Sequence, residues 1–366
     1  MGKYTHLIDL DDLSRDVIEE IVRVGEQIAD NPQHFAAACK NKVMATLFYE
    51  PSTRTQMSFQ AAMLRLGGTI IGFDNPETSS VAKGENLKDT TKVVTSYADI
   101  MVMRNPREGS AKAAALTAEC PVINAGDGGH LHPTQTLTDL LTIQAEKKRI
   151  DNLTIGLCGD LKYGRTVHSL CKAMAKFPNN RFALISTPEL TLPDYIKSFI
   201  TKNHCEIKEY ASIEEAMPEL DIIYMTRIQK ERFTAESAEC QNNFILDAEK
   251  MKLAKEDLIV LHPLPRVDEI TIDVDDDPRA KYFMQAKYGV YVRMAIILIT
   301  LENRYPQKLL SGIDSDKLIC TNPKCVTRTE GYLPKRFLQS ESGYVCEYCE
   351  QKAFVTDKDD IQLILK

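Results

Sequence analysis

The pentapeptide Pro51-Ser52-Thr53-Arg54-Thr55 has the residue types of an anion-binding site. It follows an apolar run at 43–49 that predicts a buried strand, and apolar residues at helical spacing come after it. A strand that turns into a helix here directs free backbone N–H groups and the positive end of the helix dipole at a ligand. Hydroxyl groups and a planar guanidinium add donors that suit phosphate. An ordinary capped helix with a solvated arginine explains the same residues, so this segment alone leaves both interpretations open.

Polar residues also stand where further strands are expected to end. Helical patterns alternate with strands expected at 69–73, 99–103, 121–124, 153–158, 182–186, 207–210, 221–225 and 258–261. This alternation predicts parallel sheets, whose ligands bind beyond the carboxyl ends of the strands. The residues at those ends are mostly cationic: Arg54, Arg104, His132, Arg165, Arg227 and Gln229. A lone arginine is more often a surface cation, but four at separate ends predict a pocket for substrates with several negative charges.

The same pattern predicts an α/β chain of two doubly wound parallel-sheet lobes and a small C-terminal zinc-ribbon-like β domain. A helix is expected at 8–30, and a long apolar helix at 289–304 is expected to pack back onto the first lobe. The predicted domains are a first lobe at 1–133 plus 289–304, a second lobe at 134–288, a linker at 305–317 and a zinc-binding domain at 318–366.

The charge balance argues against a nucleic-acid-binding protein, because 45 Lys and Arg stand against 52 Asp and Glu, for a net charge of −7. A local arginine cluster can still make one cleft positive. Residues 1–11 lack the apolar core of a signal peptide, and no run approaches the roughly 20 apolar residues that span a bilayer. We therefore expect a cytoplasmic protein that binds neither nucleic acid nor membrane.

Four of the ten cysteines form two close pairs in the order Cys320-x4-Cys325-x20-Cys346-x2-Cys349. In the cytoplasm this spacing favours one structural zinc ion per chain over two disulfides or an iron–sulfur centre. Four thiolates leave no open position for water, so the ion would stabilise the domain without taking part in catalysis. The other six are expected to be buried thiols: Cys39, Cys120, Cys158, Cys171, Cys205 and Cys240.

Ordered motifs along the first 304 residues resemble the aspartate carbamoyltransferase catalytic chain. They are Ser52-Thr53-Arg54-Thr55, Lys83-Gly84-Glu85, Met103-Arg104, His132-Pro133-Thr134-Gln135, 159–165, 226–232 and His262-Pro263-Leu264-Pro265-Arg266. The resemblance implies the two-lobed fold of that family. It also implies carbamoyl phosphate and L-aspartate as substrates, N-carbamoyl-L-aspartate and phosphate as products in de novo pyrimidine biosynthesis, and no catalytic cofactor.

The resemblance assigns roles to the residues that would bind carbamoyl phosphate, most of them in the first lobe. The phosphate would be held by Ser52, Thr53, Arg54, Thr55 and Arg104. The carbamoyl oxygen would be polarised by Thr55, Arg104 and His132. The carbamoyl amine would be contacted by Gln135. Two residues of a polar loop resemble those that reach into a neighbouring subunit's site: Ser79 and Lys83.

Matching residues of the second lobe would bind the amino acid. The aspartate carboxylates would be bound by Arg165, Arg227 and Gln229. The amino groups would be fixed by the backbone carbonyls of Pro263 and Leu264, with a cis peptide bond between Leu264 and Pro265.

The cysteine-bearing tail resembles the zinc domain of the regulatory chain of the same enzymes. In that chain a nucleotide-binding domain precedes the zinc domain, whereas 305–319 is too short to contain one. We therefore expect no nucleotide effector site on this polypeptide. The zinc domain of the family docks on a catalytic chain, so the tail is expected to bind its own chain or a neighbouring subunit. A homo-oligomer is implied, either a trimer or a multiple of trimers, with active sites shared between subunits.

Two other functions fit parts of the sequence. An ornithine enzyme of the same class would carry a Ser-Met-Gly motif and a His-Cys-Leu-Pro segment. Here the second segment is His262-Pro263-Leu264-Pro265, and Arg227 would repel a cationic side chain. A non-catalytic binding or scaffold protein would use the zinc tail to hold a partner, but it would not need the polar residues of the first lobe. Both comparisons favour an aspartate-specific enzyme.

Overall fold

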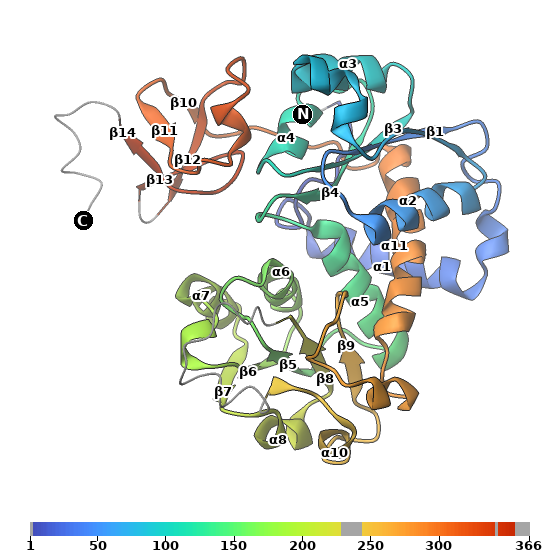
Figure 1. The fold of residues 1–366 in the computed structure, drawn as a ribbon, viewed down its shortest axis with the longest axis vertical. Helices are drawn as coiled ribbons and strands as arrows, with labels where there is room; N and C mark the ends of the chain where they lie inside the picture. Colours follow the sequence, from blue (N-terminus) through green and yellow to red (C-terminus); the bar gives the residue numbers. More distant parts are fainter. Residues whose placement is uncertain (1–2, 228–243, 341–342, 356–366) are drawn as a thin grey trace. The chain divides into compact units, whose positions relative to one another are not determined.

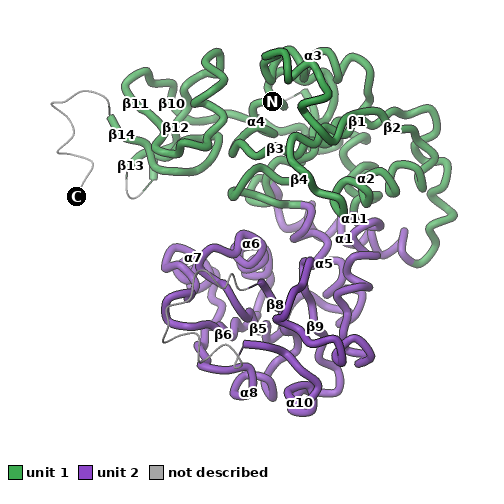
Figure 2. Tube along the Cα trace, in the orientation of Figure 1, with its two compact units in different colours: residues 1–12, 30–133, 293–366 green, residues 13–29, 134–292 purple. Residues whose placement is uncertain are grey.

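The computed structural model describes residues 3–227, 244–340 and 343–355 (Figure 1). The chain divides into two compact units, which Figure 2 colours separately. Unit 1 comprises Met1–Asp12, Asp30–Pro133 and Arg293–Lys366, and unit 2 comprises Leu13–Ala29 and Thr134–Val292. Among the helices in the described ranges, none is both long and apolar enough to cross a bilayer.

Unit 1 is built on a four-stranded parallel sheet in the order β2-β1-β3-β4 (Figure 1). Its strands are β1 (Val43–Phe48), β2 (Thr69–Phe73), β3 (Ile100–Asn105) and β4 (Val122–Asp127). The connecting helices are α2 (Thr53–Arg65), α3 (Leu87–Thr95) and α4 (Ser110–Ala115). The near-continuous burial of β1, β3 and β4 is typical of parallel strands covered on both faces.

The helix predicted at 8–30 begins too early, because α1 spans only Arg15–Asp30 and residues 8–14 lie outside it. Just before them, Leu7 pairs in parallel with Ile123 of β4. Its N–H donates to the Val122 carbonyl at 2.9 Å, and its carbonyl accepts from the Asn124 N–H at 2.8 Å. The chain around Leu7 therefore extends the edge of the sheet, and the apolar spacing did not show that the helix starts only at Arg15.

Unit 2 contains a five-stranded parallel sheet in the order β7-β6-β5-β8-β9. Its strands are β5 (Thr154–Cys158), β6 (Arg181–Ile185), β7 (Glu206–Tyr210), β8 (Ile222–Met225) and β9 (Ile259–Leu261). Its helices include α6 (Arg165–Met174), α7 (Asp194–Lys202), α8 (Ile213–Ala216) and α10 (Ala248–Met251). Two longer helices continue from one unit into the other: α5 (Pro133–Lys147) and α11 (Tyr282–Glu302).

The long helix expected at 289–304 starts earlier, at Tyr282. Beyond it, short antiparallel strands form the C-terminal module (Figure 1). They are β10 (Ile313–Asp314), β11 (Leu318–Cys320), β12 (Arg336–Ser340), β13 (Gly343–Cys346) and β14 (Ala353–Val355). Two parallel-sheet lobes followed by a small β module confirm the predicted fold class.

A buried histidine makes the stability of unit 1 depend on pH. His6 is only 4% exposed, and its Nδ1 accepts a hydrogen bond from the Val122 N–H at 3.1 Å. Burial lowers the pKa of His6 from 6.5 to about 4. Between pH 6.5 and pH 4, His6 is protonated in the unfolded chain but stays neutral in the folded chain. Stability should therefore fall by up to about 3 kcal/mol as the pH drops from 6.5 to 4.

Urea unfolding of the wild type and of His6→Gln measures this effect at several pH values. The variant lacks the titrating imidazole, so its free energy of unfolding should change less steeply over that interval. Equal pH slopes for the two proteins would contradict this assignment.

Candidate active site

The start of α2 lies just beyond the carboxyl end of β1, where the sequence predicts an anion-binding site. Ser52 precedes the helix and makes no side-chain capping hydrogen bond, so its hydroxyl is available to a ligand. Thr53 begins the helix, whose first N–H groups lack intrahelical partners. Thr55 is buried and Arg54 is exposed. This is the strand–turn–helix arrangement expected from the sequence.

Arg104 ends the next strand of the sheet, directly beside β1. Residues Phe48 and Arg104 are paired in the sheet register, and the Tyr49 N–H donates to the Arg104 carbonyl at 2.8 Å. In the sheet, β2 lies on one side of β1 and β3 lies on the other, so the strand order reverses between β1 and β3. This pair is the topological switch point of the sheet. Ligands of doubly wound sheets bind at such points.

The guanidinium of Arg104 is buried, with the residue 9% exposed. Its Nη2 lies 2.8 Å from Glu50 Oε1, and its Nη1 donates to the Ala125 carbonyl at 3.3 Å. Nη1 also lies 3.5 Å from Nε2 of His132. The structure therefore brings Arg104 and His132 together. Sequence reasoning missed Glu50, although it stands directly between the first strand and Pro51.

Gly126 permits this close packing. Its φ is +125°, and a Cβ at this position would lie 2.8 Å from Nη1 of Arg104. Only glycine combines that backbone conformation with the missing side chain. The end of β4 is therefore shaped to let the guanidinium approach the backbone.

Unit 2 carries a second polar pocket, of about 330 Å³, beyond the carboxyl ends of β5, β8 and β9. Thr226 fixes its floor, since its N–H and hydroxyl both donate to the Cys158 carbonyl, at 2.9 and 3.0 Å. The predicted residues that line this pocket are Arg165, Arg227, Pro263 and Leu264. The Leu264-Pro265 peptide is cis, as predicted. Gln229 lies outside the described residues.

Three predicted residues belong neither to the group around the start of α2 and Arg104 in unit 1 nor to the unit 2 pocket. Ser79 and Lys83 belong to the loop after β2, where two 3₁₀ turns span Pro76–Thr78 and Ser80–Lys83. Ser79 Oγ donates to the Pro76 carbonyl at 2.8 Å, and Lys83 is exposed. Gln135 lies in the first turn of α5 and donates from Nε2 to Asp139 Oδ1 at 2.8 Å.

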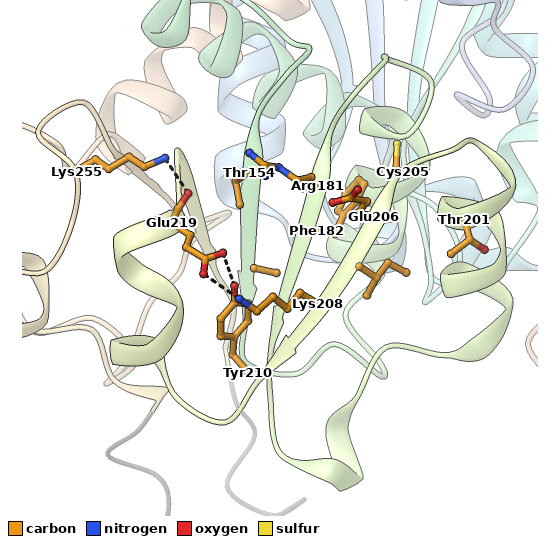
Figure 3. A pocket seen from close by; sticks show the side chains of 12 residues that line it. Thr154, Arg181, Phe182, Thr201, Cys205, Glu206, Lys208, Tyr210, Glu219 and Lys255 are labelled. Carbon is orange, nitrogen blue, oxygen red and sulfur yellow. Dashed lines mark hydrogen bonds and ion pairs between the residues drawn. The ribbon is translucent and has the colours of Figure 1, made fainter.

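A larger groove, of about 740 Å³, lies at the other ends of the unit 2 strands (Figure 3). Thr154, Arg181 and Glu206 begin β5, β6 and β7 and line it, so it stands at the amino ends of the strands. Its charged groups bind one another: Lys208 Nζ lies 2.9 Å from Glu219 Oε1, whose carboxylate also accepts from Tyr210. Its position and its internal pairing distinguish it from a substrate site.

The four tail cysteines converge on a metal centre. Their sulfur atoms all lie within 4.8 Å of one another, and all four residues are buried. The Cys320 and Cys349 sulfurs are 3.4 Å apart, and those of Cys325 and Cys346 are 3.8 Å apart. Tetrahedral coordination at a Zn–S distance of about 2.3 Å requires sulfur separations of about 3.8 Å. The donor set therefore fits a closed four-thiolate metal site.

The scattered cysteines are buried where they are described, as expected: Cys39, Cys120, Cys158, Cys171 and Cys205. Burial raises the pKa of the Cys39 thiol to about 11 and that of Cys120 to about 12. These two groups are therefore protonated and unreactive at neutral pH. Cys240 lies outside the described residues.

The metal module packs on the unit 1 lobe of its own chain. Glu108, between β3 and α4, donates its N–H to the Lys324 carbonyl at 3.0 Å and accepts from the Val326 N–H at 2.9 Å. Its carboxylate also accepts from Asn322 Nδ2 at 2.6 Å. Alanines of α4 share a hydrophobic cluster with Tyr348 and the metal-binding cysteines. The residues on both sides of Cys325 are thus bound to the segment that follows Arg104.

His130 adds an ionic contact to this interface. Its Nδ1 lies 3.1 Å from Asp127 Oδ2, and its Nε2 lies 3.5 Å from Glu350 Oε2. Burial alone would lower the pKa of His130, but the two carboxylates outweigh it and raise the pKa to about 10. The imidazolium therefore joins a carboxylate of the lobe to one of the tail at neutral pH.

Gly109 tests this docking. Its φ is +85°, and a Cβ would lie 2.7 Å from both Cβ and the carbonyl oxygen of Tyr348. Gly109→Ala should weaken the contact, because the added Cβ would overlap Tyr348, and the left-handed backbone would add strain of roughly 1–3 kcal/mol to the lobe itself. Gly331→Ala is a matched control, because no atom lies within 4 Å of that Cβ position.

Hydrogen exchange at the Val326 amide measures the effect, since this N–H closes the bond to Glu108. Exchange should accelerate in Gly109→Ala and stay at the wild-type rate in Gly331→Ala. Unchanged protection in Gly109→Ala would show that the tail does not dock on this surface.

Three family models match successive parts of the chain. Residues 5–145 match the carbamoyl-P binding domain of aspartate/ornithine carbamoyltransferase, and 151–300 match its Asp/Orn binding domain. Residues 310–361 match the metal binding domain of the aspartate carbamoyltransferase regulatory chain. The matches therefore combine domains of a catalytic and a regulatory chain in one polypeptide.

Known catalytic chains match the region of the first two family models over nearly their own full length. The aspartate carbamoyltransferase catalytic subunit of Finegoldia magna is 57% identical over 300 residues, which are 81% of this chain and 98% of the relative. The solved catalytic subunit of M. jannaschii aspartate transcarbamoylase is 44% identical, with a TM-score of 0.77, and the match covers 82% of this chain and 98% of that chain. The Trypanosoma cruzi aspartate transcarbamoylase, solved with N-(phosphonacetyl)-L-aspartic acid, is 39% identical with a TM-score of 0.75, over 81% of this chain and 95% of that one.

Proposed function

The chain belongs to the aspartate carbamoyltransferase family, and we propose that its two polar sites divide the reaction of that family between them. The enzyme transfers the carbamoyl group of carbamoyl phosphate to the amine of L-aspartate, giving N-carbamoyl-L-aspartate and phosphate, a step of pyrimidine biosynthesis. The observation that best supports this proposal is the position of the buried Arg104 guanidinium at the switch point of the unit 1 sheet. Its Nη1 lies 3.5 Å from Nε2 of His132.

The unit 1 residues bind carbamoyl phosphate. The free N–H groups at the start of α2, the hydroxyls of Ser52, Thr53 and Thr55, and the guanidiniums of Arg54 and Arg104 neutralise the phosphate. Attack on the carbamoyl carbon builds negative charge on its oxygen. Thr55, Arg104 and His132 stabilise that charge, and one such donor is worth about 3–4 kcal/mol.

The unit 2 residues bind aspartate. Its two carboxylates are bound by Arg165, Arg227 and Gln229. The backbone carbonyls of Pro263 and Leu264 accept hydrogen bonds from the amino group of aspartate and from the amine of the carbamoyl group. Arg227 disfavours ornithine, because the cationic side chain of that amino acid would meet a like charge. Holding both substrates in reacting geometry lowers the barrier by roughly 7–11 kcal/mol, so catalysis proceeds largely by positioning.

The leaving phosphate takes the proton of the attacking amine. It is already in the site, and it becomes more basic as the bond to the carbamoyl carbon breaks. A single side-chain substitution that alone moved the acidic limb of the pH–rate profile would identify a protein base instead.

The four thiolates of the tail hold one zinc ion, which is structural because its coordination shell is closed. The enzyme is a cytoplasmic trimer or a multiple of trimers. In it the loop residues Ser79 and Lys83 complete the active site of a neighbouring subunit. The segment 305–319 leaves no room for a nucleotide-binding domain, so feedback control by nucleotides is not expected on this chain.

Substitution of one arginine in each site separates the two roles. Arg54→Ala should lower kcat by about 10²–10³, because it removes charge stabilisation from the phosphate side. Arg227→Ala should chiefly raise the KM for aspartate, by about 10- to 100-fold, because a hydrogen bond to a charged group is lost. Arg65→Ala, at the far end of α2, is the control.

A colorimetric assay of carbamoyl aspartate gives these constants. The control should retain wild-type kinetics. Wild-type constants from both Arg54→Ala and Arg227→Ala would remove the assignment of the two sites.

Metal removal tests the tail and the assembly together. A thiol-compatible chelator should unfold the module, because metal binding supplies much of the folding free energy of so small a domain. Native mass spectrometry should give a multiple of three chains and one zinc ion per chain before treatment. A module that keeps its hydrogen-exchange protection without metal would contradict the structural role, and a monomer mass would contradict the shared sites.

A further inference from the structure

We propose that Gln285 is a positioning residue of the reaction, the central link of a buried hydrogen-bond relay between Gln135 and the Pro263-Leu264 backbone. The inference rests on the proposed function, in which the two carbonyls hold the amino groups, and on the contact to the carbamoyl amine that the family resemblance implies for Gln135. All members of the relay lie within unit 2.

The relay begins at Asp139, one turn after Gln135 in α5. The Asp139 side chain is fully buried. Its Oδ1 accepts from Gln135 Nε2 at 2.8 Å and from Gln285 Nε2 at 2.6 Å. Its Oδ2 accepts from the Tyr224 hydroxyl at 3.1 Å. Donors from α5, α11 and β8 thus converge on one carboxylate, which compensates for its burial.

Gln285 has a single possible orientation in this arrangement. It is 1% exposed, and its Nε2 faces the Asp139 carboxylate, which only accepts. Its Oε1 faces the backbone N–H of His262 at 2.9 Å, which only donates. A flipped amide would lose both bonds. Gln285 therefore connects α5 to the end of β9, because its amide nitrogen binds Asp139 and its amide oxygen binds the His262 N–H.

His262 connects Gln285 to the backbone of Leu264, one of the two residues whose carbonyls are proposed to bind substrate. Its Nδ1 accepts from the Leu264 N–H at 2.7 Å, so the proton is on Nε2, which lies 2.7 Å from Glu269 Oε1. Glu269 is held in turn by the N–H groups of Val267 and Asp268. Leu264 sits at φ +55°, a region that a leucine rarely adopts, and the imidazole fixes it there.

The relay connects Gln135 with the Pro263 and Leu264 carbonyls. In the proposed reaction these groups contact the nitrogen atoms of the carbamoyl amine and of the aspartate amine. Gln135 and the carbonyls of Pro263 and Leu264 lie on separate elements, and buried bonds fix their separation. Errors of about 1 Å in such positions cost about 100-fold in rate. A buried core contact would contribute only stability, whereas this relay sets the geometry of the reacting groups.

Gln285→Glu tests the relay through pH. A protonated glutamic acid copies the amide, because its O–H donates to Asp139 and its other oxygen accepts from the His262 N–H. An ionised glutamate would repel the Asp139 carboxylate, so the shared site should hold a proton at low pH and lose it as the pH rises. The titratable groups that face this position are Asp139 from α5, Tyr224 from β8, and His262 with its partner Glu269.

The expected result is a kcat for Gln285→Glu close to the wild type at low pH, falling about 10- to 100-fold below it as the pH rises. Gln285→Leu should show a similar loss at every pH. Tyr224→Phe is the matched control, because it removes one buried hydrogen bond from the same carboxylate but leaves the path from Gln135 to Leu264 intact. Its kcat should stay within about twofold of the wild type.

The measurements are steady-state kinetics from pH 6 to 9, with circular dichroism to show that each variant is folded. If Gln285→Leu does not fold, the pH dependence of Gln285→Glu decides the question alone. A constant ratio of Gln285→Glu to wild-type kcat across this range would overturn the relay. Absence of carbamoyl transfer by the wild type would instead overturn the proposed function, so the two failures are distinguishable.

Discussion

Positive charge held at the carboxyl ends of parallel strands is the constraint on which this structure depends. A phosphate and a dicarboxylate repel each other, so both must be neutralised before their reacting atoms can meet. In unit 1 the groups proposed to neutralise the phosphate are a helix start and the Arg104 guanidinium, which β3 places at the end of its neighbour β1. Glu50, the Ala125 carbonyl and the missing side chain of Gly126 keep that guanidinium in place while it is buried. The positive site thus exists within a chain of net charge −7.

In the proposed function, positioning of the amino acid depends on a different kind of interaction. The unit 2 pocket is lined by Pro263 and Leu264, and the left-handed conformation of Leu264 has to be stabilised by the surrounding structure. The His262 imidazole provides that stabilisation from within the same segment, and Gln285 connects the segment to α5. Such buried networks are favourable only when every member is satisfied, and they then fix a single geometry. In the proposed mechanism, catalysis by positioning depends on this fixed geometry more than on the reactivity of any one group.

Local sequence pattern predicted most strands and the strand–turn–helix at residues 51–55, because each of these is encoded within a few neighbouring residues. The spacing of four cysteines predicted their cluster, and the family resemblance, not local pattern, predicted the cis peptide. Local pattern failed for the start of the first helix, which it placed at residue 8, whereas α1 begins at Arg15 and the chain just before the predicted start pairs with a sheet edge. It also failed for Glu50 and Gln285, whose roles arise from partners far away in the chain. Gln285 meets Asp139 across 146 positions, and no spacing rule encodes such a pair. The docking of the tail on Glu108 is equally nonlocal, and the sequence left it open between the chain itself and a neighbour.

The most direct test of the charge arrangement is a crystal structure of this chain with N-(phosphonacetyl)-L-aspartate, which carries the phosphonate and both carboxylates in one molecule. We predict the phosphonate at Ser52–Thr55 and Arg104, with the carboxylates bound by Arg165 and Arg227. A structure with the inhibitor bound elsewhere, and with Arg104 and Arg227 facing only solvent, would contradict the account.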